Sequence, residues 1–338
     1  MTNLNAPGNL ASHEAQLFTP FPTLESCTPA QKDALNRIRY IITDTDNTMI
    51  SHSCAVVDPA GAPSANLVSA LVNAYNYDIR IIACTGRNRA MIREDARMLG
   101  LYGWIGEMGG ITCLCHDPHN NMRETWYYTC ADMPYSPSCG ITPHECIRNS
   151  GAIDALLNEF SGDLEYYNDN MVGYQYREVT VALRGNVSNA KAQELLDSFA
   201  LPLDWIDNGI AGTVDPRYTT LTCPIADPAH PIYTYHVAPR GLSKGSSVRA
   251  CMEQLGASRD EVLCCGDSPA DCSMAGVSDA FMLMQNGASN PDCIARLAAV
   301  ADATAAGTKP AGSCTLYLSH GIACDGFAHM LNTLCALR

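Results

Sequence analysis

Basic residues, long apolar runs and secretory signals are all scarce in this sequence. Only 21 Lys and Arg residues stand against 35 Asp and Glu, which gives the 338-residue chain a net charge of −14. Such an acidic chain lacks the basic surface that sequence-independent nucleic-acid binding requires. No segment approaches the roughly 18 consecutive apolar residues of a membrane span. We therefore expect neither nucleic acid nor a membrane as a partner.

Cysteine pairs with the metal-binding C-x2-C spacing are also absent, although the chain has 17 cysteines. The first residues, MTNLNAPGNLASHEAQLF, have neither the basic start nor the apolar core of a secretory signal. In a reducing compartment most cysteines are small buried apolar residues rather than disulfide partners. The sequence thus predicts a cytoplasmic protein in which most cysteines fill the core.

Cysteine and histidine are nevertheless concentrated between residues 113 and 146. This stretch contains Cys113, Cys115, His116, His119, Cys130, Cys139, His144 and Cys146. Cys113 and Cys115 would point to the same side of a strand, so a structural zinc site is one interpretation. The missing C-x2-C pair favours the other interpretation, in which these residues are buried thiols and surface histidines.

The chain is long enough for two domains. Short apolar runs at Tyr40–Thr43 and Ile79–Ala83 alternate with amphipathic segments at Ser64–Tyr75 and Asn88–Leu99. This alternation predicts an α/β fold, a Rossmann-like parallel sheet with helices on both faces. Polar and apolar residues alternate instead along strands between residues 113 and 235, which is typical of a sheet with one wet face.

We therefore expect a discontinuous core domain with an inserted domain. The core comprises residues 36–112 and 236–338, because the parallel pattern resumes after His236. The inserted α+β domain comprises residues 113–235. Residues 1–35 are rich in Pro, Ser, Thr and Asn and form an N-terminal extension.

Residues suited to phosphate chemistry follow several of the expected strands. Asp44 and Asp46 follow the first strand, and Thr85, Gly86 and Arg87 follow the second. The carboxyl ends of parallel strands form the crevice in which open α/β sheets bind ligands. Strand-end aspartates also cap turns, so this one pair leaves function undecided.

Two later segments extend the pattern. Lys244 precedes a helix, and GDSPAD at residues 266–271 follows another buried strand. Together the motifs supply acids for a hard cation, and a hydroxyl and a lysine for phosphate oxygens. Each motif alone has a plain structural explanation, but their combination in this order indicates phosphoryl chemistry.

The four motifs resemble those of the haloacid dehalogenase (HAD) superfamily. DTDNT at residues 44–48 resembles the first motif, Thr85 the second, Lys244 the third and GDSPAD the fourth. The long insertion between the second and third motifs resembles the C2-capped type IIB branch of Cof-like and sucrose-phosphatase-like enzymes. The segment Trp104–Gly110 resembles the xENGG turn of that branch, and Gly321–Ala328 resembles its DGV helix start.

This resemblance implies a Mg²⁺-dependent phosphatase acting on a small phosphorylated metabolite, such as a sugar phosphate or phosphoglycolate. Asp44 would be the nucleophile that forms an aspartyl-phosphate. Asp46 would protonate the leaving oxygen and then deprotonate water. The Mg²⁺ ligands would be Asp44, the backbone carbonyl of Asp46 and Asp267, with Asp271 as a direct or supporting ligand.

The remaining site residues follow from the same resemblance. Thr85, Gly86 and Lys244 would bind the phosphoryl oxygens. The candidates for substrate contact are Arg87, Glu107, Ser268 and Asn286. For Arg87, a surface ion pair is the alternative interpretation.

Two positions depart from the family pattern. Asn47 stands where glycine is common, and we expect this change to be harmless because Asn tolerates left-handed backbone. Ala270 stands where the family often has an Asn that contacts the phosphoryl group. Ser268 and Asn286 are the candidates to supply the lost donor.

Two other functions remain open. A phosphomutase of the phosphomannomutase type would need an Arg-rich cap, whereas this insertion has few basic residues: Arg123, Arg148, Arg177, Arg184, Lys191 and Arg217. A degenerate HAD domain with a binding or regulatory role would not need Asp44, Asp46, Lys244 and Asp267, which are all present. Both alternatives are therefore less favoured than a phosphatase.

Overall fold

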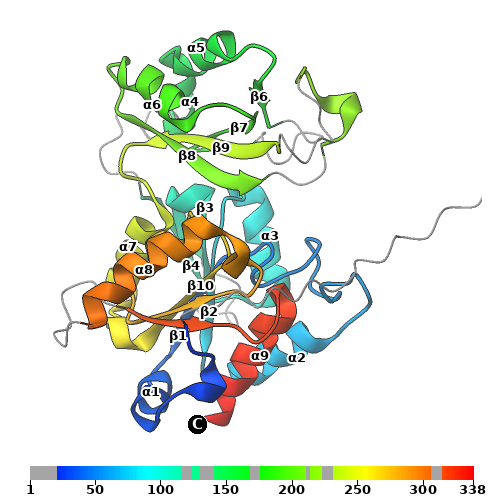
Figure 1. Cartoon of the computed structure of the whole chain (residues 1–338), viewed down its shortest axis with the longest axis vertical. Helices are drawn as coiled ribbons and strands as arrows, with labels where there is room; N and C mark the ends of the chain where they lie inside the picture. The colour runs from blue at the N-terminus through cyan, green and yellow to red at the C-terminus, as the bar shows by residue number, and fades with distance from the viewer. Residues whose placement is uncertain are drawn as a thin grey trace, which may run out of the picture.

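Two β-sheets, one above the other in Figure 1, organise the chain. The computed structural model describes residues 21–115, 124–129, 141–167, 176–210, 214–222, 231–305 and 314–338. We call the eight-stranded sheet with its helices the core and the four-stranded sheet with its helices the cap.

The core sheet has the strand order β12-β11-β10-β1-β2-β3-β4-β5. Neighbouring strands from β12 to β3 are parallel, and β4 and β5 are antiparallel. The strands are β1 (Tyr40–Thr43), β2 (Arg80–Cys84), β3 (Gly103–Gly106), β4 (Ile111–Cys115), β5 (Glu124–Tyr128), β10 (Val262–Gly266), β11 (Ala280–Leu283) and β12 (Thr315–Leu318). The predicted α/β class with a parallel sheet is thereby confirmed.

Helices cover both faces of this sheet because its central strands are apolar on both sides. Ile41 of β1 packs into one hydrophobic cluster, whereas its neighbour Ile42 packs into the other. The first cluster includes residues of α1 (Pro29–Leu35), α2 (Asn66–Asn76), α3 (Arg89–Leu99) and α9 (Ala323–Ala336). The second includes residues of α7 (Lys244–Leu255) and α8 (Pro291–Ala305) (Figure 1).

The cap is an antiparallel sheet with the order β6-β7-β9-β8, covered by three helices. Its strands are β6 (Leu164–Tyr166), β7 (Val181–Gly185), β8 (Leu203–Ile210) and β9 (Tyr233–Pro239). Its helices are α4 (Pro143–Asn149), α5 (Ala152–Glu159) and α6 (Asn189–Asp197). The inserted α+β domain is therefore present as predicted.

The boundaries of the insertion differ from the expected residues 113–235. Residue 113 lies inside β4, which pairs with β3 of the core sheet and continues into β5. Residue 235 lies inside β9, which ends at Pro239. Strand β4 follows β3 without an intervening α-helix, so the strand–helix alternation that marks the core stops before the core sheet does.

The N-terminal extension expected at residues 1–35 is described from Phe21 onward, and this part packs on the core. Phe21, Leu24 and Leu35 are buried. The backbone N–H of Leu318 in β12 donates to the carbonyl of Pro22. Residues 21–35 are therefore part of the core, and residues 1–20 lie outside the described residues.

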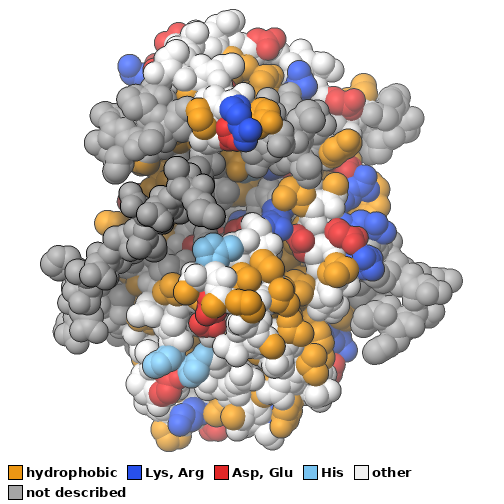
Figure 2. Space-filling model, turned by 90° about the vertical axis from the view of Figure 1, so that its right-hand side faces the viewer, with side chains coloured by type: hydrophobic (Ala, Val, Ile, Leu, Met, Phe, Trp, Pro, Cys, Tyr) orange, Lys and Arg blue, Asp and Glu red, His pale blue; other side chains and the backbone are white. Residues whose placement is uncertain are grey.

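The described cysteines are free thiols, and all of them except Cys54 and Cys146 are buried. This confirms, for those residues, that cysteine serves mainly as a small apolar residue. Positive and negative side chains are interspersed on the face shown in Figure 2. Among the described helices, none combines the length and apolarity that crossing a membrane would require.

Candidate active site

The predicted motifs meet at the carboxyl end of the parallel strands, beneath the cap. Strand β1 lies between β10 and β2, so Asp44 lies between the loops that follow those strands. A cavity of about 1010 Å³ opens there between core and cap. Of the predicted residues, those that line it are Asp44, Asp46, Thr85, Gly86, Arg87, Lys244, Asp267, Ser268 and Asn286.

Lys244 is a buried cation at the centre of the site. Its Nζ lies 2.7 Å from Oδ1 of Asp44 and 2.6 Å from Oδ1 of Asp271. A capping box between Ser243 and Ser246 starts α7 and fixes Lys244 as its first residue. Burial alone would lower the pKa of Lys244, but the charges of Asp271 and Asp44 outweigh it and raise this pKa. Lys244 is therefore held as an ammonium ion.

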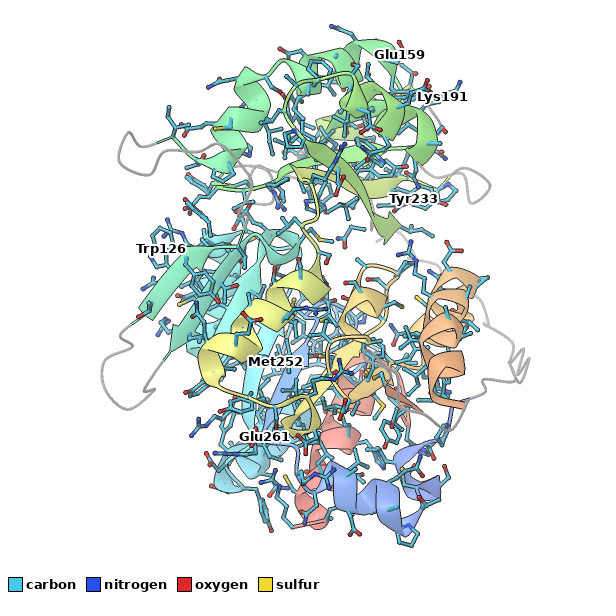
Figure 3. All side chains as sticks on the ribbon, turned by 90° about the vertical axis from the view of Figure 1, so that its left-hand side faces the viewer. Trp126, Glu159, Lys191, Tyr233, Met252 and Glu261 are labelled. Atoms are coloured by element: carbon cyan, nitrogen blue, oxygen red, sulfur yellow. The ribbon has the colours of Figure 1, made fainter. Side chains whose placement is uncertain are left out.

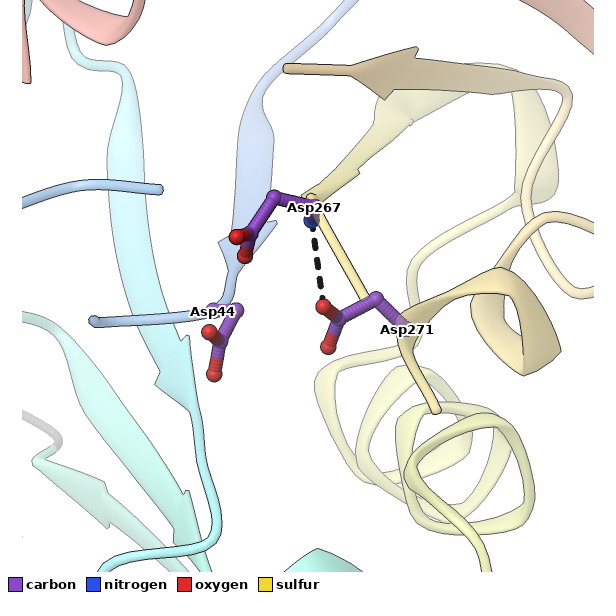
Figure 4. A group of neighbouring side chains, drawn as sticks. All are labelled: Asp44, Asp267 and Asp271. Atoms are coloured by element: carbon purple, nitrogen blue, oxygen red, sulfur yellow. Dashed lines mark hydrogen bonds between the residues drawn. The ribbon is translucent and has the colours of Figure 1, made fainter. Parts of the chain in front are cut away.

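Three carboxylates surround this lysine. One oxygen of each of Asp44, Asp267 and Asp271 lies within 4.8 Å of the others (Figure 4). Burial, together with the charges of Asp271 and Asp267, raises the pKa of Asp44 well above its ordinary range. Burial, followed by the charge of Asp271, raises the pKa of Asp267 to about 7. One ammonium thus leaves the three carboxylates with excess negative charge.

This donor set fits a Mg²⁺ ion. Carboxylate oxygens are the hard ligands that Mg²⁺ prefers, and the excess negative charge is the charge that a divalent cation neutralises. The pKa values of Asp44 and Asp267 are raised first by burial and then by the charges of neighbouring carboxylates, and a bound cation would offset that repulsion.

Asp271 supports the site rather than facing the cavity. Its Oδ2 accepts hydrogen bonds from the backbone N–H groups of Asp267 and Ser268 and from the Ser268 hydroxyl. Gly266 permits this close approach, since a Cβ there would lie only 2.1 Å from Cβ of Asp271. Of the two predicted roles for Asp271, these bonds favour the supporting one, which fixes Lys244 and the Asp267 loop.

Arg87 binds the predicted acid–base residue. Its guanidinium contacts both carboxylate oxygens of Asp46, at 2.8 and 2.5 Å, and Oδ2 of Asp95 at 2.7 Å. The alternative interpretation of Arg87 was a surface ion pair. Arg87 does form ion pairs, but its side chain is only 11% exposed and so does not lie on the surface. Asp46 and Asp95 thus bind the guanidinium that was predicted to contact substrate. Arg87 therefore orients Asp46 instead.

The phosphate loop after β2 is held from both sides. The Thr85 hydroxyl accepts the backbone N–H of Arg87 at 3.3 Å. From the cap, Arg177 donates to the carbonyl of Gly86 at 3.0 Å. Arg177 is 9% exposed and lines the cavity, although the sequence motifs did not single it out. Cap and phosphate loop are therefore directly bonded.

Glu107 is a structural link and not a substrate contact, which corrects its predicted role. Its carboxylate is fully buried and accepts the backbone N–H groups of Glu178, Val179 and Thr180 at 2.8–2.9 Å. These residues precede β7. Glu107 therefore ties the entry of the cap to the turn after β3.

Replacing Glu107 with Ala should destabilise the protein strongly, because three buried N–H groups would lose their acceptor. We expect the free energy of unfolding to fall by about 3 kcal/mol. Urea unfolding measures this change, with the exposed Glu194→Ala as the matched control. Equal unfolding midpoints for the two variants would contradict this role.

Ser268 and Asn286, the candidates to replace the donor lost at Ala270, contact other residues of the site. The Ser268 hydroxyl donates to Asp271 at 2.7 Å. Nδ2 of Asn286 lies 2.9 Å from Oδ2 of Asp267 and 3.0 Å from the carbonyl of Asn47. Both residues line the cavity, and their contact with substrate stays a prediction. Asn47 has φ +58°, as its tolerance of left-handed backbone led us to expect.

Thr48 completes the contacts of Asp267, with its hydroxyl 2.8 Å from Oδ1. Thr48 is the last residue of the DTDNT motif, but the sequence analysis assigned it no role in the site. Sequence spacing shows no signal for Asp95, because its contact with Arg87 depends on how α3 packs against β3.

The proposed zinc site stays open. Most of its candidate ligands lie outside the described residues, namely His116, His119, Cys130, Cys139 and the side chain of Cys115. Within the described part, Cys113 is buried in the core, and His144 Nδ1 donates to the carbonyl of Thr180 at 2.8 Å. The aspartate triad is the one group of described residues arranged to hold a metal ion.

Asp267 should make the metal-free protein less stable as the pH rises. Its pKa of about 7 exceeds its ordinary value of 3.8, so between these values the folded state binds a proton that the unfolded chain does not. The contribution of Asp267 to stability therefore falls from about pH 4 to pH 7. Thermal unfolding in EDTA at pH 5 and pH 8 should show a smaller loss of stability in Asp267→Asn than in the wild type. An identical loss in both proteins would contradict the prediction.

Comparison with known proteins finds relatives of one kind. Residues 229–303, which include Lys244 and the GDSPAD loop, match the family of haloacid dehalogenase-like hydrolases. This part of the chain is therefore similar to the HAD superfamily. A curated relative, the phosphoglycolate phosphatase of Methanothrix thermoacetophila, is 25% identical over 241 residues, which cover 71% of this chain and 81% of that protein.

Several solved structures share the fold of this chain. A Thermoplasma acidophilum protein matches with a TM-score of 0.54 and 14% identity, covering 89% of this chain and 99% of its own. A phosphatase of the HAD superfamily from Bacteroides thetaiotaomicron matches with a TM-score of 0.53 and 13% identity, covering 89% and 96%. The sucrose-phosphatase of Synechocystis, in complex with sucrose and phosphate, matches with a TM-score of 0.50 and 14% identity, covering 88% and 97%.

These structural matches extend over most of the chain and so include the cap as well as the core. At such low identities they demonstrate the fold alone. Together with the family match and the curated relative, they confirm the predicted capped HAD fold and the predicted class of enzyme, a phosphatase of this superfamily.

Proposed function

We propose that this protein is a Mg²⁺-dependent phosphatase that hydrolyses the monoester of a small phosphorylated metabolite, such as a sugar phosphate or phosphoglycolate. One observation carries the proposal. Lys244 Nζ bridges Asp44 and Asp271 beside Asp267, where a cavity of about 1010 Å³ meets the ends of the parallel strands. A buried lysine and a cluster of aspartates are groups that phosphoryl transfer uses.

In the first step, Asp44 attacks the phosphorus and the ester bond breaks, which leaves an aspartyl-phosphate. Lys244 holds Oδ1 of Asp44, and the attack uses the other carboxylate oxygen. The ammonium of Lys244 also offsets the negative charge of the phosphoryl oxygens, while Thr85 and Gly86 line the cavity beside them.

Asp46 moves the protons. It gives a proton to the leaving oxygen in the first step and takes one from the attacking water in the second. Its side chain is 43% exposed to the cavity and held by Arg87 in a two-oxygen contact.

Asp44, Asp267 and the backbone carbonyl of Asp46 would hold Mg²⁺, with Asp271 supporting them. When bound, the ion neutralises charge on the phosphoryl oxygens and orients them for in-line attack. Thr48 and Asn286 hold the two oxygens of Asp267, so that this ligand is fixed before the metal binds.

The charge of the cap favours hydrolysis over mutase chemistry. Of the described basic residues of the cap, only Arg177 lines the cavity. Arg184 pairs with Glu165, and Arg217 pairs with Asp215. A mutase would need further cations to grip a second phosphate.

A substrate panel tests the proposal. The purified protein is incubated with phosphorylated metabolites, either with Mg²⁺ or with EDTA, and released phosphate is measured. We expect release from at least one substrate with Mg²⁺ and none with EDTA. A folded protein that releases no phosphate from any member contradicts the proposal, and transfer between two positions of one hexose without release indicates a mutase.

A further inference from the structure

His236 of the cap lies at the ceiling of the cavity. Successive residues of β9 alternate in direction, so that Thr234 and His236 line the cavity while Tyr235 and Val237 pack inside the cap. Tyr233, near the start of β9, also lines the cavity and lies on the side of the cap toward the core (Figure 3). His236 itself is 1% exposed.

The imidazole of His236 lies beside the phosphate loop. A Cβ built on Gly86 would lie 3.6 Å from Nε2 of His236 and 3.2 Å from Nδ2 of Asn208. Both atoms come from the cap, and Gly86 follows Thr85 of the second motif. The atoms of a substrate nearest to His236 are therefore those next to its phosphate.

The network behind the ring fixes which nitrogen carries the proton. Nδ1 of His236 lies 3.3 Å from the hydroxyl oxygen of Thr180. That oxygen accepts a hydrogen bond from Arg177 at 2.9 Å, and its single proton goes to the carboxylate of Glu107 at 3.3 Å. The Thr180 oxygen can then only accept from His236, so Nδ1 bears the hydrogen and Nε2 presents a lone pair.

The surroundings keep this ring neutral. Burial lowers the pKa of His236 well below its ordinary value, and the charges of Arg177 and Lys244 lower it further. A neutral imidazole with its lone pair at Nε2 accepts hydrogen bonds and does not donate them there. It therefore suits a hydroxyl group and repels the lone pairs of a carboxylate.

We propose that His236 is a specificity-determining residue whose Nε2 accepts a hydrogen bond from a substrate hydroxyl on the carbon next to the ester carbon. This inference rests on the proposed phosphatase function and deepens it. The enzyme then selects phosphate esters of polyols, sugars included, over phosphoglycolate, whose ionised carboxylate at that position cannot donate.

Two substitutions at His236 separate the specific contact from a structural role. Asn in H236N keeps a polar atom near Thr180 but has none near the position of Nε2. Gln in H236Q is long enough to bring its carbonyl oxygen to that position. Circular dichroism and thermal unfolding establish that both variants are folded.

The matched probes are 2-hydroxypropyl phosphate and propyl phosphate, which differ by one hydroxyl, with phosphoglycolate as the acidic competitor. The measured quantity is the ratio of kcat/KM for the hydroxylated ester to that for propyl phosphate. We expect H236N to lower this ratio about 10-fold, the effect of one hydrogen bond, and H236Q to keep most of it. The wild type should prefer the hydroxylated ester to phosphoglycolate.

The results distinguish failure of this inference from failure of the proposed function. An unchanged ratio in H236N, an equal loss in H236N and H236Q, or a wild type that prefers phosphoglycolate overturns the role of His236 while leaving a phosphatase. A wild type that is active on other esters but on none of these three also overturns it. Absence of phosphate release from every ester tested overturns the proposed function itself.

Discussion

Replacing Asp44 with Asn should lower kcat for phosphate release by at least about 10³-fold. The side-chain amide of Asn cannot act as a nucleophile, so the substitution abolishes formation of the aspartyl-phosphate rather than slowing it. Asn has nearly the same shape, and its carbonyl oxygen can still accept a hydrogen bond from Lys244, so the fold should persist. The measurement is Mg²⁺-dependent phosphate release from the best panel substrate, together with circular dichroism of the variant.

The exposed Asp33→Asn is the matched control for this change, since it makes the same substitution away from the site. It should retain the full activity of the wild type. If Asp44→Asn kept more than a tenth of the wild-type kcat, Asp44 would not be the nucleophile.

Replacing Lys244 with Met should reduce both activity and stability. In the folded protein, Nζ of Lys244 lies 2.7 Å from Asp44 and 2.6 Å from Asp271. Removal of this ammonium leaves both buried carboxylates without their shared cation. Breaking a buried ion pair costs roughly 3–5 kcal/mol. We expect a large fall in Tm at pH 8 and a fall of at least about 10²-fold in kcat/KM.

The loss of stability in Lys244→Met should depend on pH. Without the lysine, the folded-state pKa of Asp44 rises further above its unfolded value, so the destabilisation grows as the pH rises and is smallest near pH 5. Lys191→Met is the control, because Lys191 is exposed on the cap (Figure 3). Equal Tm values for the two variants at pH 8 would contradict the buried ion pair.

Local patterns in the sequence were sufficient for the core strands and the motif positions. Tyr40–Thr43 is apolar and β-branched, and it forms β1 because both faces of that strand are covered. Asp44 and Thr85 then fall at strand ends, and parallel pairing of β1 with β2 brings them to one edge. Chain order alone fixed these neighbours.

Contacts between segments that lie far apart in the sequence could not be predicted in this way. Glu107 is one acidic residue in a turn, and its N–H partners begin 71 residues later. Arg177 and His236 reach the site only because the cap folds over the core. Arg87 looked suited to an oxyanion, but its orientation toward Asp46 and Asp95 is set by how α3 packs.

The β4–β5 hairpin illustrates the same limit for domain boundaries. Strand β4 (Ile111–Cys115) follows β3 without an intervening α-helix and pairs with it, and β5 (Glu124–Tyr128) pairs with β4, so both strands extend the core sheet. Which sheet a half-buried strand joins depends on tertiary pairing, which the period of the sequence does not encode.

The most direct test of the account is to look for a phosphoryl group on Asp44. The protein is mixed with Mg²⁺ and a substrate found by the panel, quenched in acid within a single turnover, and digested for mass spectrometry. The account predicts a peptide containing Asp44 that is heavier by one phosphoryl group, with no such adduct in Asp44→Asn. Phosphate release by the wild type with no adduct on that peptide would contradict the aspartyl-phosphate mechanism.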